Sequence, residues 1–165
     1  FSDMVFGFIE CYAIIAWSVL VFFQWTAYNA GSDRSWYTKK KQSWMPPGWV
    51  FPIAWTLLYS ALVIMMFYFT LNTPADSWQI ITGLVLFLVN IYFNKEWSVA
   101  FWDRQNPSAA FYILFLGMLP TSLALYFPFI LGNTVGLYYV PVIMVTLYNA
   151  WCVYALVLNY YWIEE

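Results

Sequence analysis

The aromatic and amide side chains that could bind a ligand gather in three short stretches of this 165-residue chain. In the first stretch, Trp55 and Tyr59 are four residues apart and would share one face of a helix. Such a face either lines a pocket for a flat apolar molecule or packs against a neighbouring helix, and both interpretations stay open. Trp44 and Trp49 precede them at the start of an apolar run, where they suit the aromatic belt of a membrane interface.

The other two stretches combine an amide or a small residue with large rings at helical spacing. Asn94 and Trp97 are three residues apart, so they share a helix face. An amide buried between helices needs a hydrogen-bond partner, which is either a neighbouring helix or a ligand. Trp151, Ala155 and Leu158 form the third stripe, in which the small residue lets a neighbouring helix or a flat ligand approach closely.

No catalytic constellation accompanies these stretches. The chain has no histidine, which removes the commonest metal ligand and the commonest proton carrier at neutral pH. Cys11 and Cys152 lie inside apolar runs and are typical of small hydrophobic residues, so neither a disulfide nor a metal site is indicated. Glu10 is the one charge in the first apolar run, and it stands close enough to the end for contact with water. We therefore expect a binding protein rather than an enzyme.

The composition indicates which elements position these residues. Hydrophobic residues make up 64% of the chain and charged residues 8%, whereas soluble domains carry about 25% charged residues. Continuous apolar runs favour helices over a lipid-facing barrel, whose strands would alternate polar and apolar residues. Because a helix needs about 20 apolar residues to cross a membrane, we predict an all-α membrane protein, a five-transmembrane-helix bundle in a single domain. The predicted helices cover residues 4–28, 49–71, 78–102, 109–131 and 137–162, with a long loop over 29–48.

Proline and charge add two expectations about this bundle. Pro120 lies in the middle of the fourth predicted helix and should kink it, because proline removes a backbone hydrogen bond. The basic residues all fall in the first and third loops or at their edges, which places those loops on one side of the membrane. With a net charge of −2 and no basic stripe, nothing indicates a nucleic-acid partner. The basic residues are Arg34, Lys39, Lys40, Lys41, Lys95 and Arg104.

Together, the three stretches resemble the signature motifs of the translocator protein family, TspO/MBR, also called the tryptophan-rich sensory proteins. The start of the second predicted helix, the end of the third and the middle of the fifth each match a family motif in the family's order. The matching residues are Trp44, Pro46, Pro47, Trp49, Phe51, Trp55, Leu58 and Tyr59, then Asn94, Trp97 and Phe101, and finally Tyr148, Trp151, Tyr154, Ala155, Leu158 and Asn159.

The resemblance implies an aromatic-lined cavity that binds a porphyrin or another flat hydrophobic molecule, with a bound lipid or sterol as a further possibility. Two departures make a sterol the less expected ligand. Phe111 and Tyr112 stand where family members often carry an aspartate, and no basic residue follows Arg104 to complete a C-terminal sterol-recognition motif. The expected ligand-binding residues are Trp44, Trp49, Trp55, Tyr59, Asn94, Trp97, Trp151, Ala155 and Leu158.

Two other functions remain as alternatives. The same bundle could be a structural accessory subunit of a large respiratory or photosynthetic complex, with its aromatic faces packed on neighbours or lipids. An enzyme acting on tetrapyrroles ranks last, because no acid–base pair is visible. The expected partners are membrane lipids, a hydrophobic small molecule, and either a second copy in a homodimer or the subunits of such a complex. We expect the protein in an organellar (mitochondrial) membrane, with a bacterial membrane as the alternative.

Overall fold

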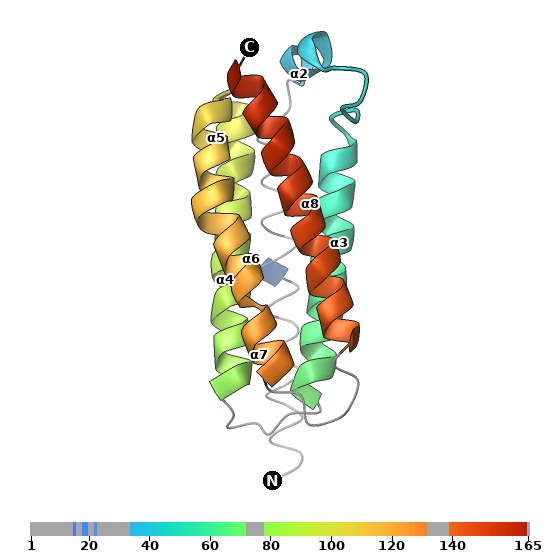
Figure 1. The fold of residues 1–165 in the computed structure, drawn as a ribbon, viewed down its shortest axis with the longest axis vertical. Helices are drawn as coiled ribbons and strands as arrows, with labels where there is room; N and C mark the ends of the chain where they lie inside the picture. The colour runs from blue at the N-terminus through green and yellow to red at the C-terminus, as the bar shows by residue number, and fades with distance from the viewer. Residues whose placement is uncertain are drawn as a thin grey trace.

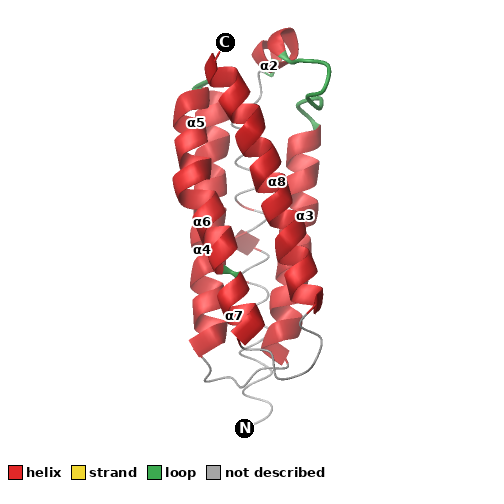
Figure 2. Ribbon diagram, viewed as in Figure 1, coloured by secondary structure: helices red, strands yellow, loops and turns green. Residues whose placement is uncertain are grey.

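The computed structural model describes residues 34–71, 78–131 and 139–164, together with Ile15, Ser18, Val19 and Phe22. Within these ranges the regular elements are all helices (Figure 1), joined by loops and without any strand (Figure 2). The first predicted helix, 4–28, lies outside the described residues except at those four positions. The all-α prediction is confirmed for the described part of the chain.

Long helical segments run side by side along the molecule (Figure 1). The last segment packs against the second and the fourth predicted helices, and the third packs against the fourth. The elements are α2 (Ser35–Lys40), α3 (Val50–Leu71), α4 (Trp78–Ser98), the π-helix η1 (Val99–Asp103), α5 (Pro107–Ile113), the π-helix η2 (Leu114–Met118), α6 (Leu119–Ala124), α7 (Tyr126–Leu131) and α8 (Tyr139–Glu164).

The long loop predicted over 29–48 is not wholly irregular, because it contains the helix α2. This helix lies at the same end of the bundle as the C-terminus (Figure 1). Tyr37 anchors it: the side chain is fully buried, and its hydroxyl donates a 2.7 Å hydrogen bond to the carbonyl of Pro46, just before α3. Burial raises the pKa of Tyr37, so the neutral phenol is the form that makes this contact.

Pro120 is accommodated by a wider helical turn, the π-helix η2, immediately before it. Proline has no N–H to donate, and in a regular α-helix its ring would press against the carbonyl four residues earlier. The Thr121 hydroxyl donates a 2.7 Å hydrogen bond to the Gly117 carbonyl, so a side chain supplies a donor to the altered backbone. A turn at Leu125 then separates α6 from α7. The disturbance predicted at Pro120 is thus absorbed within the helix.

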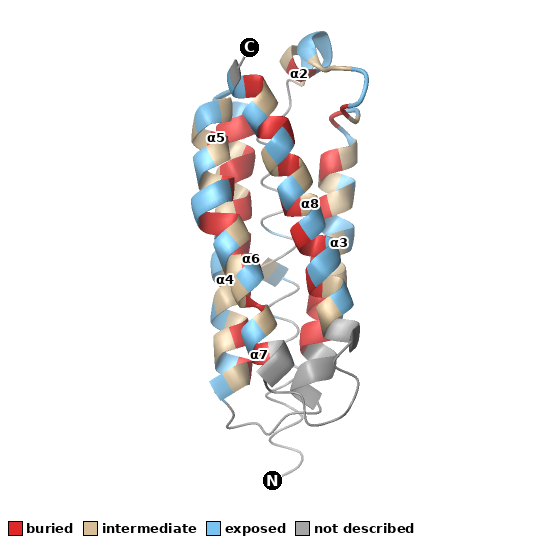
Figure 3. Ribbon diagram, viewed as in Figure 1, coloured by how far each residue is buried: buried red, intermediate tan, exposed pale blue. Residues whose placement is uncertain are grey.

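Apolar side chains cover the outside of the bundle as well as its core. Figure 3 shows buried residues on the inward faces of the helices and exposed residues on the outward faces. Exposed positions include large apolar side chains at helical spacing, such as Val153 and Val157 on α8. Among the described residues, two helical stretches are long and apolar enough to cross a membrane, Pro107–Pro128 and Val142–Ile163. An outer surface of this kind is suited to lipid rather than water.

Candidate functional site

An aromatic cluster, formed by Phe51, Trp55, Trp97 and Trp151, occupies the interior between α3, α4 and α8. The centroid of the Trp55 ring lies 5.7 Å from that of Trp97 and 6.0 Å from that of Trp151, both in edge-to-face arrangements. Phe51, one turn earlier on α3, lies 6.2 Å from Trp97 and 5.9 Å from Trp151. The three tryptophans predicted from separate stretches of sequence therefore meet in one place.

Several N–H donors around the aromatic cluster have no hydrogen-bond partner in the part of the chain that the structure describes. They are the indole Nε1 atoms of Trp55 and Trp151 and the side-chain Nδ2 atoms of Asn94 and Asn159. Leaving a buried donor unpaired costs roughly 1–3 kcal/mol, and folded proteins retain few such groups. Trp97 differs, because its Nε1 donates a 2.7 Å bond to Oδ1 of Asn159. Since all four unpaired groups are donors, they match a molecule that carries acceptors.

Ala155 and Leu158 lie on α8, one and two turns after Trp151, and both are completely buried. Their burial means that neighbouring side chains fill the space around them, which is the helix-packing role weighed for this stripe. The rings of the aromatic cluster are also in mutual contact. A ligand that enters here must therefore displace side chains.

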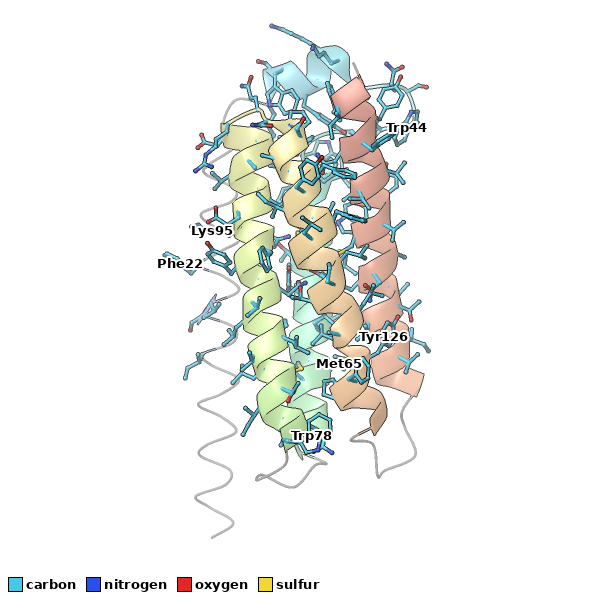
Figure 4. All side chains as sticks on the ribbon, turned by 60° about the vertical axis from the view of Figure 1, so that its left-hand side comes forward. Phe22, Trp44, Met65, Trp78, Lys95 and Tyr126 are labelled. Atoms are coloured by element: carbon cyan, nitrogen blue, oxygen red, sulfur yellow. The ribbon has the colours of Figure 1, made fainter. Side chains whose placement is uncertain are left out.

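Trp44 and Trp49 lie apart from the aromatic cluster. Trp44 is 46% exposed and makes edge contacts with Tyr154 and Tyr161 of α8, at centroid distances of 6.3 and 5.8 Å. Figure 4 places it near the end of the bundle opposite Trp78. Trp49 is 61% exposed and lines a groove on the outer face of α3. Both positions suit the interfacial role considered for these two residues.

A second group of rings, here called the end cap, joins α2 to the bundle. Its centroid distances are 5.2 Å for Tyr37–Trp102, Trp36–Phe101 and Trp36–Trp162. The sequence motifs do not bring together Trp36, Tyr37, Trp102 and Trp162, because two of these residues lie in the segment predicted as loop. The available signal was the pair of adjacent rings, Trp36 and Tyr37, inside an otherwise polar stretch.

Arg34 holds the end cap against the start of α3. Its Nη1 donates a 3.1 Å hydrogen bond to the carbonyl of Gly48. Its guanidinium carbon lies 5.2 Å from the centre of the Trp102 ring, which is a cation–π contact. Gly48 permits this approach, because a Cβ there would lie 3.3 Å from Cδ of Arg34. Arg34 thus links the first connection to the end of the α4–η1 segment.

A mid-bundle polar cluster, formed by Tyr59, Asn90, Thr121 and Tyr148, lies beside the aromatic cluster. The Tyr59 hydroxyl donates to Oδ1 of Asn90 at 2.9 Å, and the Tyr148 hydroxyl donates to the same oxygen. The Asn90 Nδ2 donates to the Met118 carbonyl at 2.9 Å and to the Thr121 hydroxyl at 2.8 Å. The amide of Asn90 is therefore fully satisfied. Tyr59, expected as a ligand-binding residue, directs its hydroxyl into this polar cluster.

Comparison with known proteins decides the family. Residues 11–163 match the TspO/MBR family. The chain belongs to the TspO/MBR family. Tryptophan-rich protein TspO of Chlorobaculum tepidum is 38% identical over 80 residues, and Protein CrtK of Rhodobacter capsulatus is 30% identical over 86 residues. These matches cover 46 and 52% of this chain and 48 and 53% of those relatives, so the chain spans about half the length of the two proteins. A tryptophan-rich sensory protein of Cereibacter sphaeroides is 27% identical over 130 residues, covering 76% of this chain and 73% of that protein.

Membership of the TspO/MBR family confirms the resemblance drawn from the motifs and makes this chain a membrane protein. The motif residues of this TspO/MBR protein are divided among several places in the structure: the aromatic cluster, the mid-bundle polar cluster, the end cap through Phe101, and the exposed positions of Trp44 and Trp49. In the described ranges, no group of histidine, cysteine, aspartate and glutamate side chains could hold a metal ion. The aromatic cluster presents ring faces and N–H donors without a partner among the described residues.

Proposed function

We propose that this protein binds a flat hydrophobic ligand, a tetrapyrrole above all, at the aromatic cluster. The observation that carries the proposal is the set of unpaired buried donors on Trp55, Trp151 and Asn94. A tetrapyrrole offers large ring faces for stacking and carboxylate oxygens that accept hydrogen bonds. Ring burial contributes affinity, and pairing the stranded N–H groups removes their desolvation cost. Ring burial and the pairing of these N–H donors therefore both favour the ligand-bound state.

The ligand has to part rings that now touch each other. Trp151 is the ring best placed to move, because it is only partly buried whereas Trp55 and Trp97 are fully buried. In the proposed complex, Trp151 swings aside and stacks on one face of the ligand. Its truncation should therefore weaken binding.

Titration with protoporphyrin, followed by quenching of tryptophan fluorescence, tests the proposal. The wild type should show saturable quenching, and Trp151→Ala should weaken binding about tenfold, which corresponds to about 1.4 kcal/mol. Asn94→Leu, which removes one unpaired donor while keeping its volume, should weaken binding severalfold. Trp78→Phe is the matched control at the other end of the bundle, where the side chain is exposed. Quenching that does not saturate, or that is unchanged in Trp151→Ala, would instead favour the accessory-subunit alternative. Co-migration of the protein with a larger complex on native gels would support that alternative.

The proposal includes the membrane arrangement. We propose five membrane-spanning helices, with the Lys39–Lys41 segment and the C-terminus on one side. Single cysteines introduced at Lys40 and at Gln105 should react with a membrane-impermeant thiol reagent from the same side of sealed vesicles. A mitochondrial membrane stays a prediction, and fractionation of the native cells would test it. Reaction of the two positions from opposite sides would contradict the arrangement.

A further inference from the structure

The outer face of α3 carries a groove that the aromatic cluster does not use. Its volume is about 480 Å³, and its α3 residues recur at intervals of three and four, which places them on one helix face. Phe51, Trp55 and Tyr59 face the interior from the other side of the same helix. The groove is lined by Arg34, Trp49, Pro52, Ile53, Thr56 and Leu57.

One end of this groove is cationic. Arg34 lies there with its guanidinium fixed in place, by the hydrogen bond to the Gly48 carbonyl and by the Trp102 ring beneath it. Two exposed lysines, Lys39 and Lys40, and the partly buried Lys41 follow on and just after α2 at the same end of the bundle. A guanidinium held in one orientation is suited to bind a phosphate through two parallel hydrogen bonds.

The rest of the groove is apolar. Trp49, Ile53 and Leu57 are 61, 51 and 66% exposed and follow each other at one-turn intervals. The Thr56 hydroxyl needs no acceptor from a ligand, because it donates a 2.7 Å hydrogen bond to the Pro52 carbonyl of its own helix. From Val50 at the start of α3 to Leu57 the helix rises about 10 Å, which is most of the roughly 15 Å hydrocarbon depth of one leaflet.

We propose that this groove is a binding site for one anionic phospholipid. The phosphate pairs with Arg34, and one acyl chain lies along Trp49, Ile53 and Leu57. The positive charge of Arg34 favours an anionic headgroup. The groove changes along the helix from a cationic end to an apolar floor, which is the order in which a phospholipid places its headgroup and acyl chains. The site lies on the opposite face of α3 from the proposed tetrapyrrole site and does not depend on it.

Native mass spectrometry of the delipidated protein, titrated with phosphatidylglycerol and phosphatidylcholine of identical chains, tests the proposal without any porphyrin. The singly lipid-bound peak of the wild type should favour phosphatidylglycerol at least threefold. Arg34→Gln should bring this ratio close to one. Arg104→Gln is the matched control, because it removes a basic residue near the same end that does not line the groove. Equal loss of preference in the two variants would indicate general charge attraction and overturn the proposal.

A second pair of variants keeps Arg34 and the end cap intact. Thr56→Phe fills the apolar part of the groove and should reduce retention of phosphatidylglycerol at least threefold. Ile64→Phe adds a ring at another exposed position of α3 that does not line the groove and should leave retention unchanged. Retention that is unaffected by Thr56→Phe, or a wild type that takes the two lipids equally, would overturn the proposal.

Discussion

Replacing Asn90 by leucine measures how much the mid-bundle polar cluster stabilises the fold. Asn90 lies on α4 and contacts groups from three other helical segments. Its Oδ1 accepts from the hydroxyls of Tyr59 on α3 and Tyr148 on α8, and its Nδ2 donates to the Met118 carbonyl and the Thr121 hydroxyl of the η2–α6 segment. Leucine has nearly the same volume and makes none of these bonds. The substitution therefore removes four polar contacts without opening a large cavity.

The expected loss of unfolding free energy is about 2 kcal/mol. Hydrogen bonds between side chains of membrane helices contribute about 0.6 kcal/mol each on average. The loss stays moderate because the partners keep other contacts. Without Asn90, one of the two tyrosine hydroxyls can donate to the other across their 2.8 Å contact, and Thr121 keeps its bond to the Gly117 carbonyl. Stranded hydroxyls would each add roughly 1–3 kcal/mol, so a loss above about 4 kcal/mol would mean that these secondary bonds fail.

Reversible unfolding in mixed micelles, followed by far-ultraviolet circular dichroism, gives the unfolding free energy. Val85→Leu is the control, because Val85 is an exposed α4 position and its replacement should change stability by less than about 0.5 kcal/mol. Combining Asn90→Leu with Tyr148→Phe should show a coupling energy of about 0.6 kcal/mol. A loss below about 0.5 kcal/mol for Asn90→Leu, together with additive effects in the double variant, would refute the assignment of an energetic role to this cluster.

Three further changes probe other contacts. Gly117→Ala should destabilise the bundle by about 1–3 kcal/mol, because the new Cβ would lie 2.5 to 2.7 Å from ring carbons of Phe93. Thermal melts measure this loss, and an unchanged melting temperature would show that the Phe93 ring moves aside without cost. Asn106→Ala should lower the free energy of unfolding by about 1 kcal/mol, because the Asn106 side chain accepts a 3.0 Å hydrogen bond from the Ala109 N–H at the start of α5. Asn106→Ser should keep most of the wild-type stability, and equal stability of the wild type and both variants would contradict the capping role. Burial raises the pKa of Tyr37, so the unfolded chain loses this phenol proton at a lower pH than the folded protein does, and stability should fall as the pH rises above about 10. The melting temperature of Tyr37→Phe should decline less steeply across that range, and parallel curves for the two proteins would show that Tyr37 is not the group responsible.

The interior of the bundle could be predicted from helical spacing to a large extent. Trp55, Trp97 and Trp151 each share a face with another large or polar residue, and all three reach the aromatic cluster. Trp49 and Trp55 are six residues apart, which separates them by about 120° around a helix. That separation predicts that the two rings serve different faces, and in the structure Trp49 is exposed just before α3 whereas Trp55 on α3 is buried.

The polar cluster could not be predicted in the same way. The sequence points to Asn94, which stands near Trp97 in a recognisable motif, whereas Asn90 stands alone in an apolar run. Asn90 nevertheless has the richer set of contacts, because its position faces the Met118 carbonyl and Thr121 next to η2. Which of two amides one turn apart finds partners depends on a distortion in another helix. Local sequence carries no information about such a non-local match.

The π-helix η2 also determines the register of the segment that follows it. Fully buried side chains recur every four residues from Ala110 to Ser122, although an unbroken α-helix would turn Ser122 about 120° away from Ala110 over that distance. The i→i+5 bonding of η2 places one more residue in this turn than the bonding of an α-helix does. Deleting one residue there would rotate all of α6 and α7 together, and would separate the Ser122 hydroxyl from its 2.6 Å contact with Asn149.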